Sequence, residues 1–173
     1  MILCISTFLK GQNDLIGKLF PTMEVETIND LKVKLPDSVA GKYTLLGLAY
    51  SKKTEDDLLT WFEPIFNKFV NKPEGVLKGF GHDVNVFFIP MFTGINAAAA
   101  GTVKRKSLKK TDPQLFPYIL FYKGQLKPYK ESLNFDNKEA PYFFVLDPRG
   151  VIVYATTGVF SDVKLDEIES VLE

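Results

Sequence analysis

The apolar segment at residues 43–50 places the strongest constraint on how this chain can fold. Its sequence is YTLLGLAY, and apolar residues occupy nearly every position. A half-exposed strand alternates polar and apolar residues, whereas a strand that is covered on both faces is apolar almost throughout. The segment therefore predicts a central strand with other elements packed on both sides, which is typical of the α/β class.

The segments around this strand predict one mixed sheet. Apolar residues alternate on both sides of Asn29-Asp30, which indicates a β-hairpin over 23–35. After the central strand, Thr54 is the predicted N-cap of a helix, and Pro64 inside that helix predicts a kink. The next predicted elements are a strand at 84–92, a helix at 95–110, an extended segment at 117–122 and an irregular segment at 127–135.

The C-terminal part predicts a ββα unit. Strands at 141–147 and 151–157 flank the short loop Pro148-Arg149-Gly150, which joins antiparallel neighbours. Ser161 or Asp162 caps a last helix. Its predicted apolar stripe contains Val163, Leu165, Ile168, Val171 and Leu172. The complete order predicts one mixed sheet with an N-terminal β-hairpin and helices on both faces.

This order resembles the thioredoxin-like superfamily, and within it the redoxin group that includes peroxiredoxins and TlpA-like envelope reductants. The resemblance rests on Phe20-Pro21 with the following hairpin and Gly41-Lys42, on the helix containing Pro64, and on APYFFVLDPRG at 140–150. It implies a thioredoxin-like three-layer α/β/α sandwich for residues 19–173. It also implies that Pro141 occupies the place of that superfamily's cis-proline.

The chain contains one cysteine, Cys4, and one histidine, His82. One cysteine excludes an internal disulfide, a CxxC pair and a thiolate-based zinc site. In redoxins the catalytic cysteines lie between the first long strand and the kinked helix, where this chain reads SKKTEDD at 51–57. Disulfide exchange needs a thiolate. We therefore expect no catalytic residue, no bound metal and no cofactor here, and an enzyme is the less favoured interpretation.

The resemblance to redoxins, together with the absence of cysteine from segment 51–57, implies that the protein binds a partner rather than catalyses a reaction. Trp61, Pro64-Ile65-Phe66 and the segment 129–158 resemble a redox-inactive family typified by a mitochondrial assembly factor for the ATP synthase membrane sector. We expect a protein or peptide client to pair with the backbone beside Pro141, in an assembly or chaperone-like role. The residues expected to line this groove are Ser51, Lys52, Lys53, Thr54, Asp56, Ala140 and Pro141. The alternative is a divergent thiol oxidoreductase or peroxidase that uses Cys4 or a partner's thiol.

Four further features each have two interpretations. His82-Asp83 is either a base with its orienting carboxylate or an exposed turn. The helix start at 54–57 binds an anion or is only well capped. The basic run Lys104–Lys110 meets an acidic partner or anionic lipid headgroups, or it places cations at the negative end of a helix dipole. The tyrosines of the 117–135 region belong to the core or to a recognition surface: Tyr118, Tyr122 and Tyr129.

Charge and the N-terminal segment bear on partners and location. Lys and Arg together number 21, as do Asp and Glu, and the zero net charge argues against nucleic acid as the partner. Residues 1–18 form a separate segment in which ILCISTFL at 2–9 predicts an edge strand or the remnant of a signal peptide. The first interpretation favours the cytoplasm and the second the cell envelope. Membrane association is expected only through a partner or the basic run.

Overall fold

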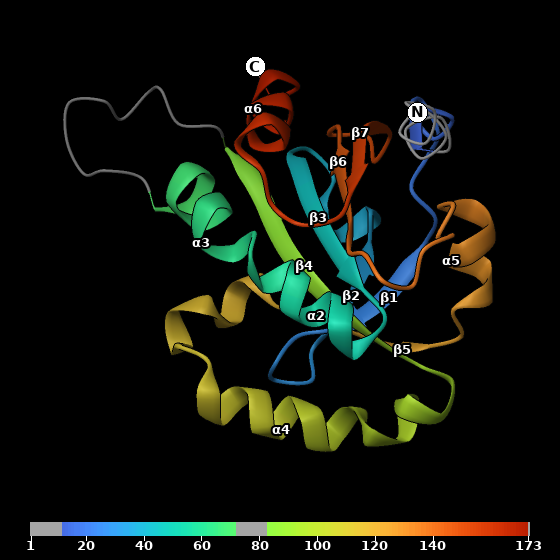
Figure 1. Cartoon of the computed structure of the whole chain (residues 1–173), viewed down its shortest axis with the longest axis vertical. Helices are drawn as coiled ribbons and strands as arrows, with labels where there is room; N and C mark the ends of the chain where they lie inside the picture. The colour runs from blue at the N-terminus through green and yellow to red at the C-terminus, as the bar shows by residue number, and fades with distance from the viewer. Residues whose placement is uncertain (1–11, 72–82, 173) are drawn as a thin grey trace, which may run out of the picture.

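The computed structural model describes residues 12–71 and 83–172, and it contains one mixed sheet of seven strands (Figure 1). The strand order is β2-β1-β5-β4-β3-β6-β7. Adjacent strands β3, β4 and β5 are parallel, and the remaining pairs are antiparallel. The strands are β1 (Met23–Glu26), β2 (Lys32–Leu35), β3 (Tyr43–Ala49), β4 (Val84–Thr93), β5 (Phe121–Gly124), β6 (Tyr142–Leu146) and β7 (Ile152–Thr157).

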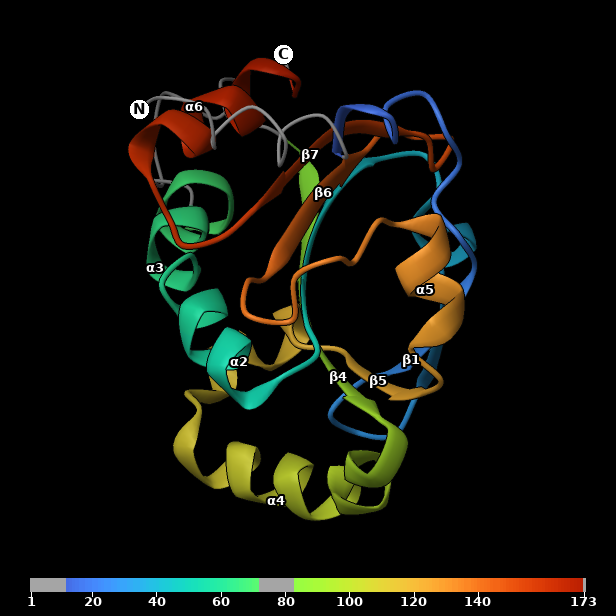
Figure 2. The ribbon, with the colours of Figure 1, turned by 45° about the vertical axis from the view of Figure 1, so that its right-hand side comes forward.

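Helices cover both faces of this sheet, with α2, α3 and α6 on one side and α5 on the other (Figure 2). Helix α4 lies across one end of the molecule. The α-helices are α2 (Lys52–Leu59), α3 (Phe62–Ile65), α4 (Ala100–Lys110), α5 (Lys127–Ser132) and α6 (Asp162–Ser170). Shorter turns of other helix types are η1 (Asp37–Val39), η2 (Phe66–Val70), η3 (Gly94–Ala99) and η4 (Pro113–Tyr118). The predicted α/β sandwich with a mixed sheet is confirmed.

The central strand β3 divides its side chains between two hydrophobic clusters. Leu45 and Ala49 pack with the residues of α2, α3 and α6, whereas Leu46 and Leu48 pack with those of α5. All four are buried. The prediction that residues 43–50 are covered on both faces is therefore confirmed, because alternate side chains of a strand point to opposite faces.

Gly47 in the middle of β3 lets α2 approach the sheet closely. A Cβ at this position would lie 2.7 Å from Phe143 Cε1 and 2.9 Å from Leu58 Cδ1. Atoms at those separations overlap, so any side chain at Gly47 would displace Phe143 or Leu58. The bare backbone of Gly47 thus sets the position of α2 against β6.

The helix after β3 differs in detail from its prediction. Its N-cap is Ser51 rather than Thr54, and α2 begins at Lys52. Helix α2 ends at Leu59, and a separate helix, α3, begins at Phe62 and contains Pro64. Proline has no N–H to donate to the carbonyl four residues earlier, so the predicted kink takes the form of a break.

The region between α4 and β6 was the least well predicted. The expected irregular segment at 127–135 contains α5, which has Pro128 in its first turn, where a missing N–H does no harm. The expected extended segment at 117–122 begins later, because η4 runs to Tyr118 and β5 starts at Phe121. Short elements of four to six residues carry too little periodicity to be recognised from sequence.

The described N-terminal residues run beside the start of β7. Gly17 N–H donates to Ile152 O at 2.8 Å, and Ile152 N–H donates to Lys18 O at 2.8 Å. Leu19 forms a bridge with Val151. The strand or signal-peptide remnant predicted at 2–9 lies outside the described residues. Within residues 12–71 and 83–172, no helix is long and apolar enough to cross a membrane.

Candidate functional site

The start of α2 is closed by reciprocal hydrogen bonds between Ser51 and Thr54. Thr54 N–H donates to Ser51 Oγ at 3.3 Å, and Ser51 N–H donates to Thr54 Oγ1 at 3.1 Å. The Thr54 hydroxyl also donates to Ser51 O at 2.8 Å. Thr54 is fully buried. This is a capping box in which threonine takes the place that glutamate usually fills, so these groups are already satisfied within the chain.

Two further contacts join the start of α2 to the loop before β6. Ser51 Oγ donates to Lys138 O at 2.8 Å. Lys53 Nζ pairs with Glu139 Oε2 at 3.2 Å, with both side chains mostly exposed. The predicted groove was to lie between these two segments. The two contacts join these segments at Ser51 and at Lys53.

Pro141 does not have the predicted conformation. Among the described residues the cis peptide bond joins Leu35 and Pro36, and the Ala140–Pro141 bond is trans. Pro141 is buried, and its carbonyl accepts hydrogen bonds from Gly158 N at 2.9 Å and from Thr157 Oγ1 at 2.8 Å. The predicted cis conformation of Pro141 is therefore wrong, and the Pro141 carbonyl is already hydrogen bonded within the chain.

The seven predicted site residues separate into an inner and an outer set. The buried members are Thr54, Ala140 and Pro141, and Ser51 is half-buried. The exposed members are Lys52, Lys53 and Asp56. Helical spacing puts these three on one outward face of α2, together with Leu59. The carboxylate of the neighbouring Glu55 has a raised pKa because of its burial and its proximity to Asp56.

Exposed apolar side chains occur at the end of α2 and in the segment at the start of α6, two segments that one hydrogen bond joins. Leu59 is 64% exposed, and Val159 and Val163 at the start of α6 are 52% and 67% exposed. Thr60 Oγ1 accepts a hydrogen bond from Phe160 N at 3.2 Å, which holds the end of α2 against the loop before α6. We call Leu59, Val159 and Val163 the apolar cluster. The sequence prediction missed it, because Val163 was assigned to the buried stripe of the last helix.

Trp61 fixes the loop that carries Val159. Its ring is fully buried, and it stacks on Phe143 with centroids 4.1 Å apart. Trp61 Nε1–H donates to Gly158 O at 2.9 Å. Lys164 Nζ donates to the carbonyls of Thr157 and Val159, each at 2.9 Å, and burial lowers the pKa of its ammonium group. Three successive carbonyls therefore have side-chain donors, which fixes the loop that presents Val159.

The remaining sequence candidates have different outcomes. Cys4 and His82 lie outside the described residues. Tyr122 and Tyr129 are buried in the α5 cluster, so they belong to the core, while Tyr118 is half-buried against Phe66. No group of three or more His, Cys, Asp or Glu in the described part of the chain is arranged to hold a metal ion.

Comparison with known proteins places the architecture. No protein-family profile matches the sequence, and no curated protein matches it. Solved structures do match. The thioredoxin domain of a thiol-disulfide oxidoreductase from Bacteroides vulgatus aligns with a TM-score of 0.61, covering 91% of this chain and 98% of its own, at 16% identity. The fold is thioredoxin-like.

Other thioredoxin-like structures agree with this assignment. The C-terminal domain of a putative thiol-disulfide oxidoreductase from Bacteroides thetaiotaomicron gives a TM-score of 0.58 at 12% identity, covering 91% of this chain and 95% of its own. Yeast Sco1 with copper bound gives 0.55 at 17% identity, covering 89% and 92%. Identities this low establish the shared fold alone. The thioredoxin-like scaffold of this chain has Ser51, Lys52, Lys53 and Thr54 at the start of its first helix, and no CxxC pair.

Proposed function

We propose that this chain is a redox-inactive thioredoxin-like protein that binds a protein or peptide partner. The observation that supports this most directly is the capped start of α2. In the segment 51–57, where the resemblance places the catalytic cysteines of redoxins, the hydroxyl groups of Ser51 and Thr54 are hydrogen bonded to each other and to the chain. A hydroxyl cannot replace a thiolate in disulfide exchange. The start of α2 is thus suited to holding the helix against the loop before β6 rather than to disulfide exchange.

The partner surface that we propose is the outward face of α2 together with the apolar cluster. Exposed apolar side chains that gather at one place mark interaction sites more often than isolated ones do. Lys52, Lys53 and Asp56 supply a polar border along the same helix, as the rims of interfaces do. A partner segment with an apolar side chain seated between Leu59 and Val163 would match this arrangement. An assembly or chaperone-like role, as in the redox-inactive family resembled, is part of the proposal.

The absence of redox turnover is tested with the purified full chain. We expect neither insulin reduction with a thiol donor nor consumption of hydrogen peroxide above the rate without protein. The matched control is Cys4→Ser, which removes the one cysteine of the chain. Turnover by the wild type that disappears in Cys4→Ser would contradict the proposal and establish the thiol-dependent alternative.

Partner binding is tested by placing a photo-cross-linking amino acid at single exposed positions in cells of the source organism. We expect discrete adducts from positions 53, 59 and 163, and none from position 130 on α5, which is also exposed. The double variant Leu59→Ser/Val163→Ser should lose the adduct that forms from position 53. Adducts from position 130 alone would show that the partner lies on another face.

A further inference from the structure

The basic run predicted at 104–110 forms most of α4, which crosses one end of the molecule away from the other α-helices (Figures 1 and 2). From Gly94 to Thr111 the chain contains no Asp and no Glu. The helix therefore has no acidic residue of its own to pair with its cations. The positions of the individual cations then decide which of them can meet a partner.

Lys104 is committed to the protein's own structure. Its side chain is buried, and Nζ donates to Thr27 O at 2.5 Å and to Asp30 Oδ1 at 2.6 Å. The ammonium group also lies 5.4 Å from the centroid of the Phe121 ring. These contacts fix the rotation of α4 about its axis, because they require Lys104 to face the turn between β1 and β2.

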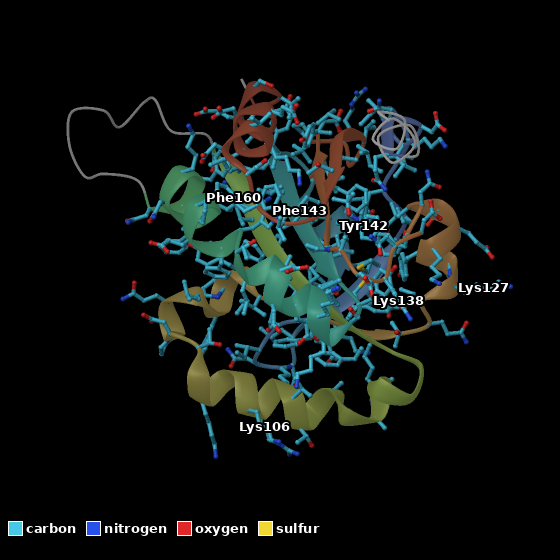
Figure 3. The ribbon with its side chains drawn as sticks, viewed as in Figure 1. Lys106, Lys127, Lys138, Tyr142, Phe143 and Phe160 are labelled. Atoms are coloured by element: carbon cyan, nitrogen blue, oxygen red, sulfur yellow. The ribbon has the colours of Figure 1, made fainter. Side chains whose placement is uncertain are left out.

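The other described cations of α4 consequently face outward. Arg105, Lys106 and Lys109 are exposed and, with Thr102, follow the spacing of three and four residues that defines one helix face. Figure 3 shows Lys106 on the side of α4 that is turned away from the sheet. Arg105 Nη2 is 3.5 Å from Thr102 Oγ1.

These three side chains form no ion pair with any carboxylate of the described residues. Elsewhere in the chain, Lys34, Lys42 and Lys53 each have an acidic partner. The helix dipole favours a cation in the last turn, which accounts for Lys109. It does not account for Arg105 and Lys106, which lie before that turn. The structure thus leaves a compact cationic face without internal compensation.

We propose that the outward face of α4, formed by Arg105, Lys106 and Lys109, binds an acidic segment of a protein partner. Charge complementarity favours this class of partner, because the face is cationic and has no carboxylate of its own helix beside it. The zero net charge of the chain argues against nucleic acid, which binds proteins with a basic excess. A helix that lies on a membrane surface needs a large apolar face, and none of the exposed large apolar side chains of the described residues lies on α4. This surface is separate from the one proposed on α2 and does not depend on it.

The test measures binding of a fluorescein-labelled octaglutamate peptide to the full chain by fluorescence anisotropy, at low and at physiological ionic strength. The test variant is Arg105→Gln/Lys106→Gln/Lys109→Gln, which keeps helix-forming residues on α4. The control is Lys18→Gln/Lys127→Gln/Lys130→Gln, which removes the same charge from exposed positions elsewhere. We expect the test variant to weaken binding about tenfold, and the control to change it less than about twofold.

Three outcomes would overturn the proposal. Equal weakening by the control variant would show that only net charge matters. Failure of the wild type to bind the peptide would exclude the acidic-segment assignment. Tighter binding to phosphatidylserine vesicles or to a DNA duplex than to the peptide, lost in the test variant, would assign the face to those partners instead. Lys106→Glu is a second variant at a fully exposed position, and it should weaken peptide binding further without altering the melting curve.

Discussion

The two ends of α2 differ in how their side chains are used. At the start, Ser51 and Thr54 satisfy each other and the adjoining backbone, and Thr54 has no contact with solvent. At the end, Leu59 is exposed, and the buried Trp61 donates a hydrogen bond to Gly158 O in the loop that carries Val159. One end is closed by hydrogen bonds, and the other combines an exposed apolar surface with a packed base.

This difference supports our proposal that the thioredoxin-like scaffold is used here without disulfide exchange. The first N–H groups of a helix favour an anion or a thiolate, which is why reactive cysteines are placed there. Here Ser51 Oγ accepts from Thr54 N–H, so the position serves the stability of the helix. Recognition is proposed for the opposite end, where a rigid base reduces the entropy lost on binding.

The largest expected effect comes from removing the base of the apolar cluster. Trp61→Ala should lower the free energy of unfolding by about 3–5 kcal/mol, because it leaves a cavity beside Phe143. Trp61→Phe keeps the ring contact but loses the bond to Gly158 O, and should lower it by about 1–2 kcal/mol. Urea denaturation measures both. A loss below about 1 kcal/mol for Trp61→Ala would contradict the assignment of Trp61 as the anchor.

The stability of the protein should depend on the buried hydroxyl of Thr54 at the start of α2. Thr54→Val preserves the shape but leaves the Ser51 N–H without its acceptor, so we expect the free energy of unfolding to fall by about 1–2 kcal/mol. The comparison variant is Thr60→Val at the other end, where the exposed hydroxyl bonds Phe160 N and Asp57 O and a smaller loss of about 0.5–1 kcal/mol is expected. Equal losses at the two positions would remove the contrast between the ends.

Alkaline pH should weaken the closed end through Tyr50, which directly precedes Ser51. Burial raises the pKa of Tyr50 above its ordinary value of 10.0, with the neighbouring Tyr142 adding to the effect. Above pH 10 the unfolded chain releases the phenolic proton while the folded chain retains it, so stability present below that pH is lost as the pH rises. We expect a loss of about 1 kcal/mol between pH 10 and 11, and a smaller loss in Tyr50→Phe. Urea denaturation across this range would measure it, and an unchanged slope in Tyr50→Phe would assign the effect to other tyrosines.

The smallest effect is expected for the ion pair that bridges the expected groove. Lys53 and Glu139 are mostly exposed, so the coupling energy from a double-mutant cycle with Lys53→Met and Glu139→Gln should lie below about 0.5 kcal/mol. A coupling above about 1 kcal/mol would mean that the bridge, and not the capping box, keeps this end closed.

Sequence reasoning recovered the elements with strong periodicity. The central strand at 43–50, the hairpin around Asn29-Asp30 and the C-terminal ββα unit are all present, because their apolar spacing and turn residues are long enough to be distinctive. It missed α5, whose six residues include a proline. Local patterns at that length cannot outweigh the tertiary contacts that decide the conformation.

The candidate site was only partly predictable for a different reason. The absence of thiols after β3 can be counted in the sequence, and the exposure of Lys52, Lys53 and Asp56 follows from their polarity. The trans bond before Pro141 and the exposure of Val163 are set by the tertiary structure and leave no mark in the local sequence pattern. Helical periodicity identified an apolar stripe on α6, but it could not show that Val163 at its edge extends beyond the core.

The two edges of the sheet limit how a partner strand can add to it. The edge strand β2 presents Lys32 and Lys34 to solvent, and lysines on an edge strand discourage the addition of another strand. At the opposite border, residues 17–19 already occupy the hydrogen-bonding groups at the start of β7. Backbone pairing with a partner or with a second copy of the chain is thereby made less favourable at β2 and at the start of β7. Under the proposed function, specificity then rests on helix-borne side chains, and it can evolve one surface residue at a time without disturbing the sheet.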